Sequence, residues 1–231
     1  MKVIAWNIRQ GGGTRINKIF EVLKNENAHV IVLSEYRNNR NGALLRNKLL
    51  SIGYRHQFVT SSSSNVNSVM IASKLPGDGI LHPNADPEYG DNIIELRFPF
   101  FGVLGGYFPH KKKHILFDYI HKTHIRSELP YLITGDFNSG KNFIDQRGNS
   151  FWYQEDLVRW EKCGYLDAFR LVRGDTKEYS WYSHQGNGFR YDHAYISPLL
   201  SEIIADCRYL HAYREKKISD HSPLVISFNT L

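Results

Sequence analysis

Cysteine is scarce in this sequence, with Cys163 and Cys207 the only two among 231 residues. Their separation does not match the spacing of a cysteine-ligated metal motif. A reducing cytosol, where free thiols persist, is the environment that this composition favours. We therefore expect a cytoplasmic protein.

Long apolar runs are missing as well. No stretch reaches the roughly 18 apolar residues that a membrane helix requires. Residues 1–7 are too short an apolar run, with too polar a continuation, for a signal peptide. The sequence therefore predicts no membrane association.

Repeats, low-complexity tracts and linkers are not found either. The serine-rich residues 61–67 are better interpreted as a loop between strands than as a domain boundary. The hydrophobic fraction of 42% and the aromatic fraction of 13% are typical of a globular protein. We expect one catalytic domain over residues 1–231, and a monomer. The net charge of +6 favours a polyanionic partner.

The apolar residues 131–133 predict a buried strand that continues through Gly135 to Asp136 and Asn138. If the strand reaches Asn138, alternation places Asp136 and Asn138 on one face and Phe137 in the core. An acid and an amide at the rim of a sheet suit the activation of a water molecule. The alternative is a strand that ends in an Asx-turn.

Other predicted strands also deliver polar side chains at their ends. Strands are expected over residues 2–6, 30–34, 69–73, 93–98, 101–107 and 190–196, with a last one after Pro223. The polar residues at their ends are Asn7, Glu35, Tyr107, Asp136, Asn138, Asp192, Asp220 and His221. Helices are expected after residues 11–13, over 44–52, after 110 and over 151–163. This order predicts a two-sheet sandwich with helices packed outside.

Two stretches offer alternative ligand sites. The three glycines at 11–13 could form a phosphate-binding nest. No lysine–serine pair follows them, so we favour a tight connection into a helix. A zinc site could be built from residues at helical spacing, but a solvated helix face is the simpler interpretation. Those residues are His114, Asp118, His121 and His124.

Six motifs in order carry a family resemblance. They are Trp-Asn7, Leu-Ser-Glu35, Gly-Tyr107-Phe-Pro, Gly-Asp136-Phe-Asn138, Arg-Tyr-Asp192 and Ser-Asp220-His221. Together they resemble the endonuclease/exonuclease/phosphatase superfamily, and most of all exonuclease III and its abasic-site endonuclease relatives. The resemblance implies an α+β fold, a four-layer α/β/β/α sandwich of two mostly antiparallel sheets flanked by helices. It also implies a divalent-metal phosphodiesterase.

The resemblance also implies roles for single residues. Glu35 would hold Mg²⁺, for which Mn²⁺ could substitute, with Asn7 and Asp220 nearby or in its shell. Asp136, oriented by Asn138, would align and deprotonate the attacking water. His221, supported by Asp192, would bind a phosphate oxygen, and Tyr107 would stabilise the phosphate or the leaving oxygen.

Basic and aromatic residues near these motifs favour a DNA substrate. A phosphate backbone could follow the cations, and Trp181 offers a face for a base or sugar to stack on. The predicted contacts include Asn7, Lys111, Lys113 and Arg190; Arg9, Arg37, Arg40 and Lys112 lie beside the same loops. The lysines at 111–113 could instead serve solubility alone.

Other functions stay open. The chain is shorter than the exonuclease III pattern after Tyr107, after Asn138 and before Arg190, which leaves abasic-site specificity unassigned. A relative acting on RNA ends, phosphotyrosyl-DNA adducts or lipid and inositol phosphates is the alternative. A non-catalytic binding module is disfavoured because the ligand and base set is complete. No Ser-His nucleophile motif occurs, so direct attack by water is expected.

Overall fold

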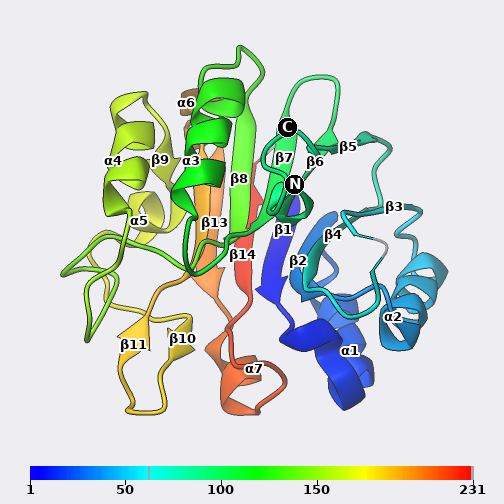
Figure 1. The fold of residues 1–231 in the computed structure, drawn as a ribbon. Helices are drawn as coiled ribbons and strands as arrows, with labels where there is room; N and C mark the ends of the chain where they lie inside the picture. Colours follow the sequence, from blue (N-terminus) through cyan, green and yellow to red (C-terminus); the bar gives the residue numbers. More distant parts are fainter. Residues whose placement is uncertain (62, 230–231) are drawn as a thin grey trace.

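Two six-stranded β-sheets are stacked face to face in the computed structural model, which describes residues 1–61 and 63–229 (Figure 1). The first sheet has the spatial order β13 (Ile204–Tyr209), β14 (Leu224–Phe228), β1 (Lys2–Asn7), β2 (Val30–Tyr36), β4 (Ser68–Ser73) and β3 (His56–Val59). The second has the order β5 (Asp78–Leu81), β6 (Ile93–Arg97), β7 (Gly102–Tyr107), β8 (Tyr131–Asp136), β12 (Asp192–Ile196) and β9 (Leu166–Asp167). A separate ribbon pairs β10 (Trp181–Tyr182) with β11 (Gly188–Phe189).

Helices cover the outer face of each sheet (Figure 1). The α-helices are α1 (Ile16–Glu26), α2 (Arg40–Ser51), α3 (His114–Ile120), α4 (Gln154–Lys162), α5 (Ala168–Arg173), α6 (Pro198–Ser201) and α7 (His211–Glu215). Two 3₁₀ turns, η1 (Gln10–Arg15) and η2 (Gly90–Asn92), and a π-helical turn, η3 (His121–Ile125), complete the set. Among the described residues, no helix combines the length and apolar character needed to span a bilayer.

Three apolar clusters separate the four layers. Strand alternation sends Val3 and Ala5 of β1 into the core between the sheets, where they meet Leu132 of β8. Ile4 and Trp6 of the same strand face outward and pack under α1 and α2. On the other side, α3 and α4 cover the outward-facing residues of β7 and β8. The predicted four-layer α/β/β/α sandwich is therefore confirmed.

The polar end of β8 departs from its predicted form. The strand ends at Asp136, and Asn138 has a left-handed backbone with φ of 47°. The Asn138 backbone N–H donates to Asp136 Oδ1 at 2.9 Å, which is an Asx-turn. The expectation that the strand continues to Asn138 is wrong, because this turn gives Asn138 a left-handed backbone that strand pairing does not allow. Phe137 is fully buried, as predicted.

Two loop predictions also have clear outcomes. Residues 61–67 do connect β3 to β4, although Ser62 lies outside the described residues. The glycines at 11–13 lead into α1 through η1, as favoured. Gly12 has φ of +75°, and an added Cβ would lie 2.7 Å from Ile19 Cδ1, so only glycine fits this connection.

Candidate active site

The strand topology gathers the predicted polar residues at one edge of the sandwich. β1 and β2 run parallel, so Asn7 and Glu35 emerge side by side from the first sheet. β7 and β8 also run parallel, and Tyr107 pairs with Asp136 at the matching edge of the second sheet. Asp192 begins the antiparallel β12 directly opposite Asp136.

His221 reaches the same edge from the segment before β14. The chain there is anchored by the motif's own residues: Ser219 Oγ donates to the Asn7 carbonyl oxygen at 2.6 Å. Trp6 Nε1 donates to the carbonyl oxygen of His221 at 2.9 Å. These bonds hold the imidazole between the two sheets.

Two buried carboxylates flank this imidazole. His221 Nδ1 lies 2.8 Å from Asp192 Oδ2, and Nε2 lies 3.9 Å from Asp136 Oδ2. The side chains of Asp136 and Asp192 are each 1% exposed, and that of His221 is 7% exposed. The three side chains are therefore shielded from bulk water.

Burial and charge shift the pKa values of this group. Burial raises the pKa of Asp136 to about 7, although the neighbouring His221 imidazolium opposes the rise. Burial alone lowers the pKa of His221, but the carboxylates of Asp192 and Asp136 raise it to about 10. At neutral pH the imidazole is charged, and Asp136 titrates where a general base works best.

Asn7 connects this group to Glu35. Its Nδ2 donates to Asp136 Oδ2 at 2.8 Å and to Glu35 Oε1 at 3.0 Å. Glu35 has a left-handed φ of 55° and interrupts the pairing of β2 with β4 between Ser34 and Tyr36. Such a bulge turns a side chain out of the strand's alternation. Here it directs the Glu35 carboxylate toward Asn7 rather than into the sheet.

The other predicted residues border this centre. Asp220 is half-buried, with Oδ2 3.6 Å from Arg9 Nε. Burial raises the pKa of Tyr107 well above its usual range, and the carboxylates of Glu35 and Asp136 add to the effect. The phenol is therefore neutral and can donate a hydrogen bond. The Asn138 amide donates to the Phe108 carbonyl oxygen at 2.8 Å, so its backbone rather than its side chain orients Asp136.

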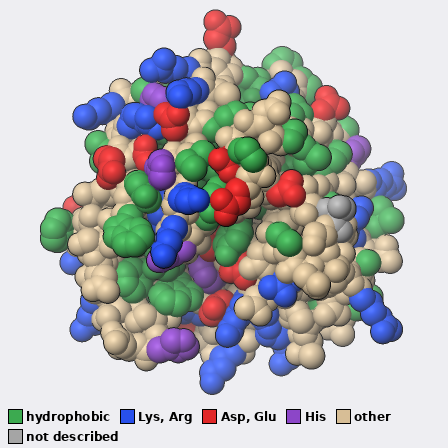
Figure 2. Space-filling model, viewed as in Figure 1, with side chains coloured by type: hydrophobic (Ala, Val, Ile, Leu, Met, Phe, Trp, Pro, Cys, Tyr) green, Lys and Arg blue, Asp and Glu red, His purple; other side chains and the backbone are tan. Residues whose placement is uncertain are grey.

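Two cavities flank the centre, and Trp181 lines both. One has a volume of about 530 Å³ and aromatic walls that include Phe151, Phe189 and Tyr191. The other has a volume of about 570 Å³ and contains the cations Arg9, Arg214 and Lys217 together with Asp220. Figure 2 shows histidine and acidic side chains in a depression of this face, with hydrophobic side chains to one side and Lys and Arg below.

Sequence comparison assigns this arrangement to a known family. The model described as the Endonuclease/Exonuclease/phosphatase family matches residues 4–221. The chain belongs to this family. Its members hydrolyse phosphoester bonds, so the protein is a hydrolase of the nuclease and phosphoesterase class. The predicted resemblance is confirmed.

Solved structures of this family share the fold over the full length of both chains. An AP endonuclease from Archaeoglobus fulgidus is 23% identical, with a TM-score of 0.84 and 100% coverage of each chain. The 3'-5' exonuclease NExo from Neisseria meningitidis is 20% identical, with a TM-score of 0.85 and the same coverage. A variant of the 3' phosphatase NExo from Neisseria, bound to a product DNA hairpin, is 20% identical with a TM-score of 0.84, again over 100% of each chain. No curated protein matches the sequence significantly.

One residue predicted to bind substrate does not line the candidate active site. Arg190 is fully buried, with Nε 2.8 Å from Asp145 Oδ1 and Nη1 3.2 Å from Asp167 Oδ1. Its full burial and its ion pairs with both carboxylates leave this guanidinium no free face for a phosphate. The prediction of a substrate contact at Arg190 is wrong, because the charge serves an internal ion network.

The two lysines predicted to contact substrate lie in different environments. Lys111 is exposed, as a phosphate contact requires, although it lines neither cavity. Lys113 is only 2% exposed, donates to the carbonyl oxygen of Asn138, and lines the aromatic cavity. Burial lowers the pKa of its ammonium to about 8. Lys113 therefore belongs to the wall of a cavity and not to an exposed basic rim.

Some residues of this site were missed by sequence reasoning. Ser34 Oγ donates to the Gly106 carbonyl oxygen at 2.8 Å and thereby ties the end of β2 to β7. Ser219 and Trp6 hold the His221 segment, as described above. Ser34, Trp6 and Ser219 each precede a predicted site residue in one of the six motifs, and this position in the sequence could have indicated them.

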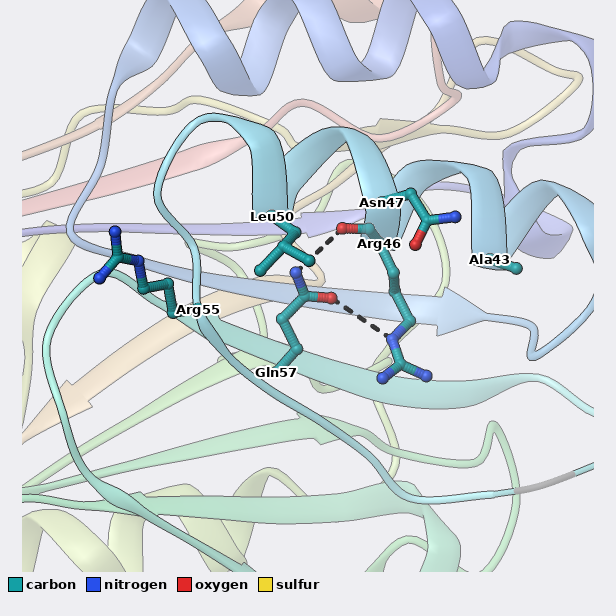
Figure 3. A pocket seen from close by; sticks show the side chains of 6 residues that line it. All are labelled: Ala43, Arg46, Asn47, Leu50, Arg55 and Gln57. Atoms are coloured by element: carbon teal, nitrogen blue, oxygen red, sulfur yellow. Dashed lines mark hydrogen bonds between the residues drawn. The ribbon is translucent and has the colours of Figure 1, made fainter.

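Another cavity of about 340 Å³ lies between α2 and the start of β3 (Figure 3). Arg46 and Arg55 line it, but Arg46 Nε donates to Gln57 Oε1 at 3.3 Å, and Gln57 donates back to the Arg46 carbonyl oxygen at 2.9 Å. None of the residues predicted to act in catalysis borders this cavity. It is therefore separate from the candidate active site.

Proposed function

We propose that this protein is a divalent-metal-dependent phosphodiesterase that cleaves DNA by direct attack of water. The observation that carries the proposal is the buried group of Asp136, His221 and Asp192, which Asn7 links to Glu35. In-line displacement at phosphorus needs a base to position the water and positive charge where negative charge develops. Each requirement has a residue in this group.

The roles follow from the chemistry of each side chain. Asp136, with its raised pKa, accepts the proton of the attacking water and aligns it. The charged His221 donates from Nε2 to a phosphate oxygen, while Asp192 holds Nδ1 and fixes the ring. Tyr107 stays neutral and donates to the phosphate or to the leaving oxygen. Asn138 holds Asp136 in place through its backbone N–H.

The donor set at Glu35 suits a hard cation. Glu35 and Asp220 are carboxylates that no fully buried cation neutralises among the described residues, and Asn7 adds an amide oxygen. Mg²⁺ binds proteins through one or two carboxylates and keeps several waters, and Mn²⁺ shares this preference. Such an ion supplies positive charge to the phosphate. We assign it to Glu35, with Asp220 and Asn7 around it.

Glu35→Gln should weaken metal binding while the fold persists. The amide keeps the size of the side chain and can still accept from the backbone N–H of Gln10, which Glu35 Oε2 accepts at 2.8 Å. It lacks the negative charge that a hard cation requires. Calorimetric titration with Mg²⁺ and Mn²⁺ measures the loss, and Glu202→Gln, an exposed position on the chain after α6, is the control. Unchanged affinity in Glu35→Gln, or full activity in excess EDTA, would contradict the assignment.

The flanking cavities support nucleic acid as the substrate. The basic cavity offers Arg9, Arg214 and Lys217 to a phosphate backbone, and the aromatic one offers stacking faces to a base or sugar. Trp181 lies between them, with its ring centroid 6.5 Å from that of His221. Of the solved structures described above, one is bound to a product DNA hairpin, and another is named an AP endonuclease. These features favour DNA over lipid or inositol phosphates.

A substrate panel with salt titration tests the proposal. The purified protein is assayed with Mg²⁺ on abasic duplex, blunt duplex, single-stranded DNA, RNA and inositol phosphates, and DNA cleavage should weaken steeply as salt rises. The pair Lys111→Ala with Lys217→Ala removes two exposed cations, and each lost phosphate contact lowers the salt slope by about 1. The exposed pair Arg126→Ala with Lys162→Ala, at the C-terminal ends of η3 and α4, lines neither cavity and should leave the slope unchanged. Salt-independent hydrolysis of inositol phosphates alone, with no DNA cleaved, would contradict a DNA nuclease.

A further inference from the structure

A second group of ligand-type side chains lies on the other face of the sheet that carries Asp136. Ile94 and Leu96 of β6 point into the core between the sheets, so Glu95 points outward, toward the helical layer. Asp136 has the same parity as Leu132 in β8 and points inward. His82, from the segment after β5, and His124, from the π-helical turn η3, converge on Glu95 from outside. This group is therefore separate from the candidate active site.

Both imidazoles direct the same nitrogen at the same oxygen. His82 Nε2 and His124 Nε2 each lie 3.4 Å from Glu95 Oε2. The other ring nitrogens are engaged by hydroxyls: Nδ1 of His82 is 3.1 Å from Tyr119 Oη, and Nδ1 of His124 is 2.7 Å from Thr123 Oγ1. A histidine that binds metal commonly has its second nitrogen held in this way, because that bond fixes the ring and the tautomer.

The second carboxylate oxygen of Glu95 is already occupied. Glu95 Oε1 accepts from Arg97 Nε at 2.7 Å and from Tyr131 Oη at 2.9 Å. Such bonds orient a ligating carboxylate, and its other oxygen, Oε2, faces the two imidazoles, with a long hydrogen bond of 3.4 Å to His124 Nε2. The three atoms that remain, two imidazole nitrogens and one carboxylate oxygen, lie within 4.8 Å of one another.

We propose that His82, Glu95 and His124 bind a zinc ion. Zinc–nitrogen and zinc–oxygen bonds of about 2.0–2.1 Å in a tetrahedral site separate neighbouring ligand atoms by about 3.3–3.4 Å. The two nitrogen–oxygen distances have this value. Charge-assisted hydrogen bonds between an imidazolium and a carboxylate are shorter, at about 2.7–2.9 Å. The spacing fits ligands around an ion better than a direct ion pair.

Burial supplies an independent argument. The side chain of His82 is 9% exposed and that of Glu95 is fully buried. Yet His82 Nε2 has no hydrogen-bond partner among the described residues. Buried polar atoms are almost always satisfied, so an unpaired one aimed at a carboxylate calls for an explanation. A zinc ion would satisfy this nitrogen, and water would fill its fourth position.

The three ligands come from three separate elements, so the ion would have a structural role. It would join the connection between β5 and β6 to the sheet and to the end of the α3 helical layer. The π-helical geometry of η3 is uncommon, and single π turns frequently accompany functional sites.

The zinc site predicted as an alternative on one helix face does not form. Asp118 pairs with Lys122 and Arg159, and His124 turns inward. The expected solvated face is wrong for His121 and His124, which are buried, whereas His114 and Asp118 are half-buried.

Metal analysis with matched variants tests the proposal. Protein stripped with EDTA is reloaded with zinc chloride, passed through gel filtration and analysed for zinc. Wild type should retain one equivalent, and His82→Gln and His124→Gln should lose it. His121→Gln, a buried histidine of the same turn outside the group, is the control and should retain it. Zinc absent from wild type, or retained by both ligand variants because it sits at Asp136 and His221, would overturn the proposal.

A spectroscopic measurement on wild type makes the test independent of how the variants fold. Cobalt(II) replaces zinc and reports geometry: a tetrahedral site gives intense visible bands, and an octahedral oxygen site gives weak ones. We expect the intense bands, and their loss when zinc chloride is added in excess. Weak bands alone would contradict a site with two histidines and one glutamate. Circular dichroism of each variant separates loss of the metal from loss of the fold.

Discussion

Asp136→Asn should lower the turnover of the proposed phosphodiesterase reaction by at least about 10²-fold, which is the low end of what a positioned general base contributes. The amide keeps the shape of the side chain and can still accept from Asn138 N–H through its oxygen. It cannot take the proton of the attacking water. Steady-state kinetics on the preferred DNA substrate measure the loss, with Asp175→Asn, an exposed carboxylate, as the control.

The stability of this variant distinguishes catalysis from structure. Because burial raises the pKa of Asp136 to about 7, the folded protein binds its proton more tightly than the unfolded chain does. Stability is therefore lost as the pH rises from the pKa of the unfolded side chain, about 4, to about 7, and the full cost of ionisation is present above that. Asp136→Asn removes that cost and loses the bond that Asn7 Nδ2 donates to Oδ2, so the two effects offset and its unfolding temperature at pH 8 should stay close to that of wild type. A variant that melts early and regains activity on cooling would indicate a structural role instead.

The pH profile of the wild type also tests the assignment of Asp136 as the general base. A base with a pKa of about 7 is protonated at lower pH, so kcat/KM should fall as the pH drops below 7. His221, with a pKa of about 10, stays charged throughout the neutral range and contributes no limb there. In Asp136→Asn the acidic limb should disappear from the residual rate. Retention of the limb in that variant would assign it to another group.

His221→Ala should also lose at least about 10²-fold in kcat, because it removes the charge placed to stabilise the transition state. Unlike Asp136→Asn, it should destabilise the fold. Asp192 is 1% exposed, and it would be left without its cation. Removing one partner of a buried ion pair costs about 3–5 kcal/mol. Thermal unfolding and kinetics at a temperature well below the transition measure the two effects separately.

A double variant separates the effect on stability from the effect on the reaction. Asp192→Asn combined with His221→Gln removes both charges and leaves two amides that can bond to each other. Its unfolding temperature should recover toward that of wild type, while its activity stays at the level of His221→Ala. If activity returned together with stability, His221 would act only through the fold, and its proposed contact with the phosphate would be wrong.

Much of the fold could be predicted because it depends on local pattern. The apolar runs that became β1, β2, β7 and β8 end at polar residues, and strand ends are set by where an apolar run stops. Helix α1 follows from apolar residues at helical spacing after a glycine turn. The sandwich follows because each predicted strand and helix has an apolar face that must be buried against another element. None of these features needs information from a distant part of the chain.

Errors arose where a residue's partners come from elsewhere. Arg190 looks like a surface cation in the sequence, but Asp145 and Asp167 bury it from 45 and 23 residues away. The turn at Asn138 depends on a competition between strand pairing and an Asx-turn, which local pattern leaves undecided. His124 looks like part of a solvated helix face, yet Glu95 and the π-helical turn draw it inward. Burial of a charge is a property of the whole fold.

The sequence by itself determined the chemical inventory of this protein: the strand-end acids, amides and histidine, and the family motifs that contain them. Only the tertiary structure decided which of them meet. Parallel pairing places Asn7 beside Glu35 and Tyr107 beside Asp136, and stacking of the two sheets brings Asn7 to Asp136, 129 positions away, at one edge. There, Asn7 touches both Glu35 and Asp136, and His221 lies between two carboxylates. The shifted pKa values arise from that burial and proximity, which are long-range properties that no local stretch of sequence contains.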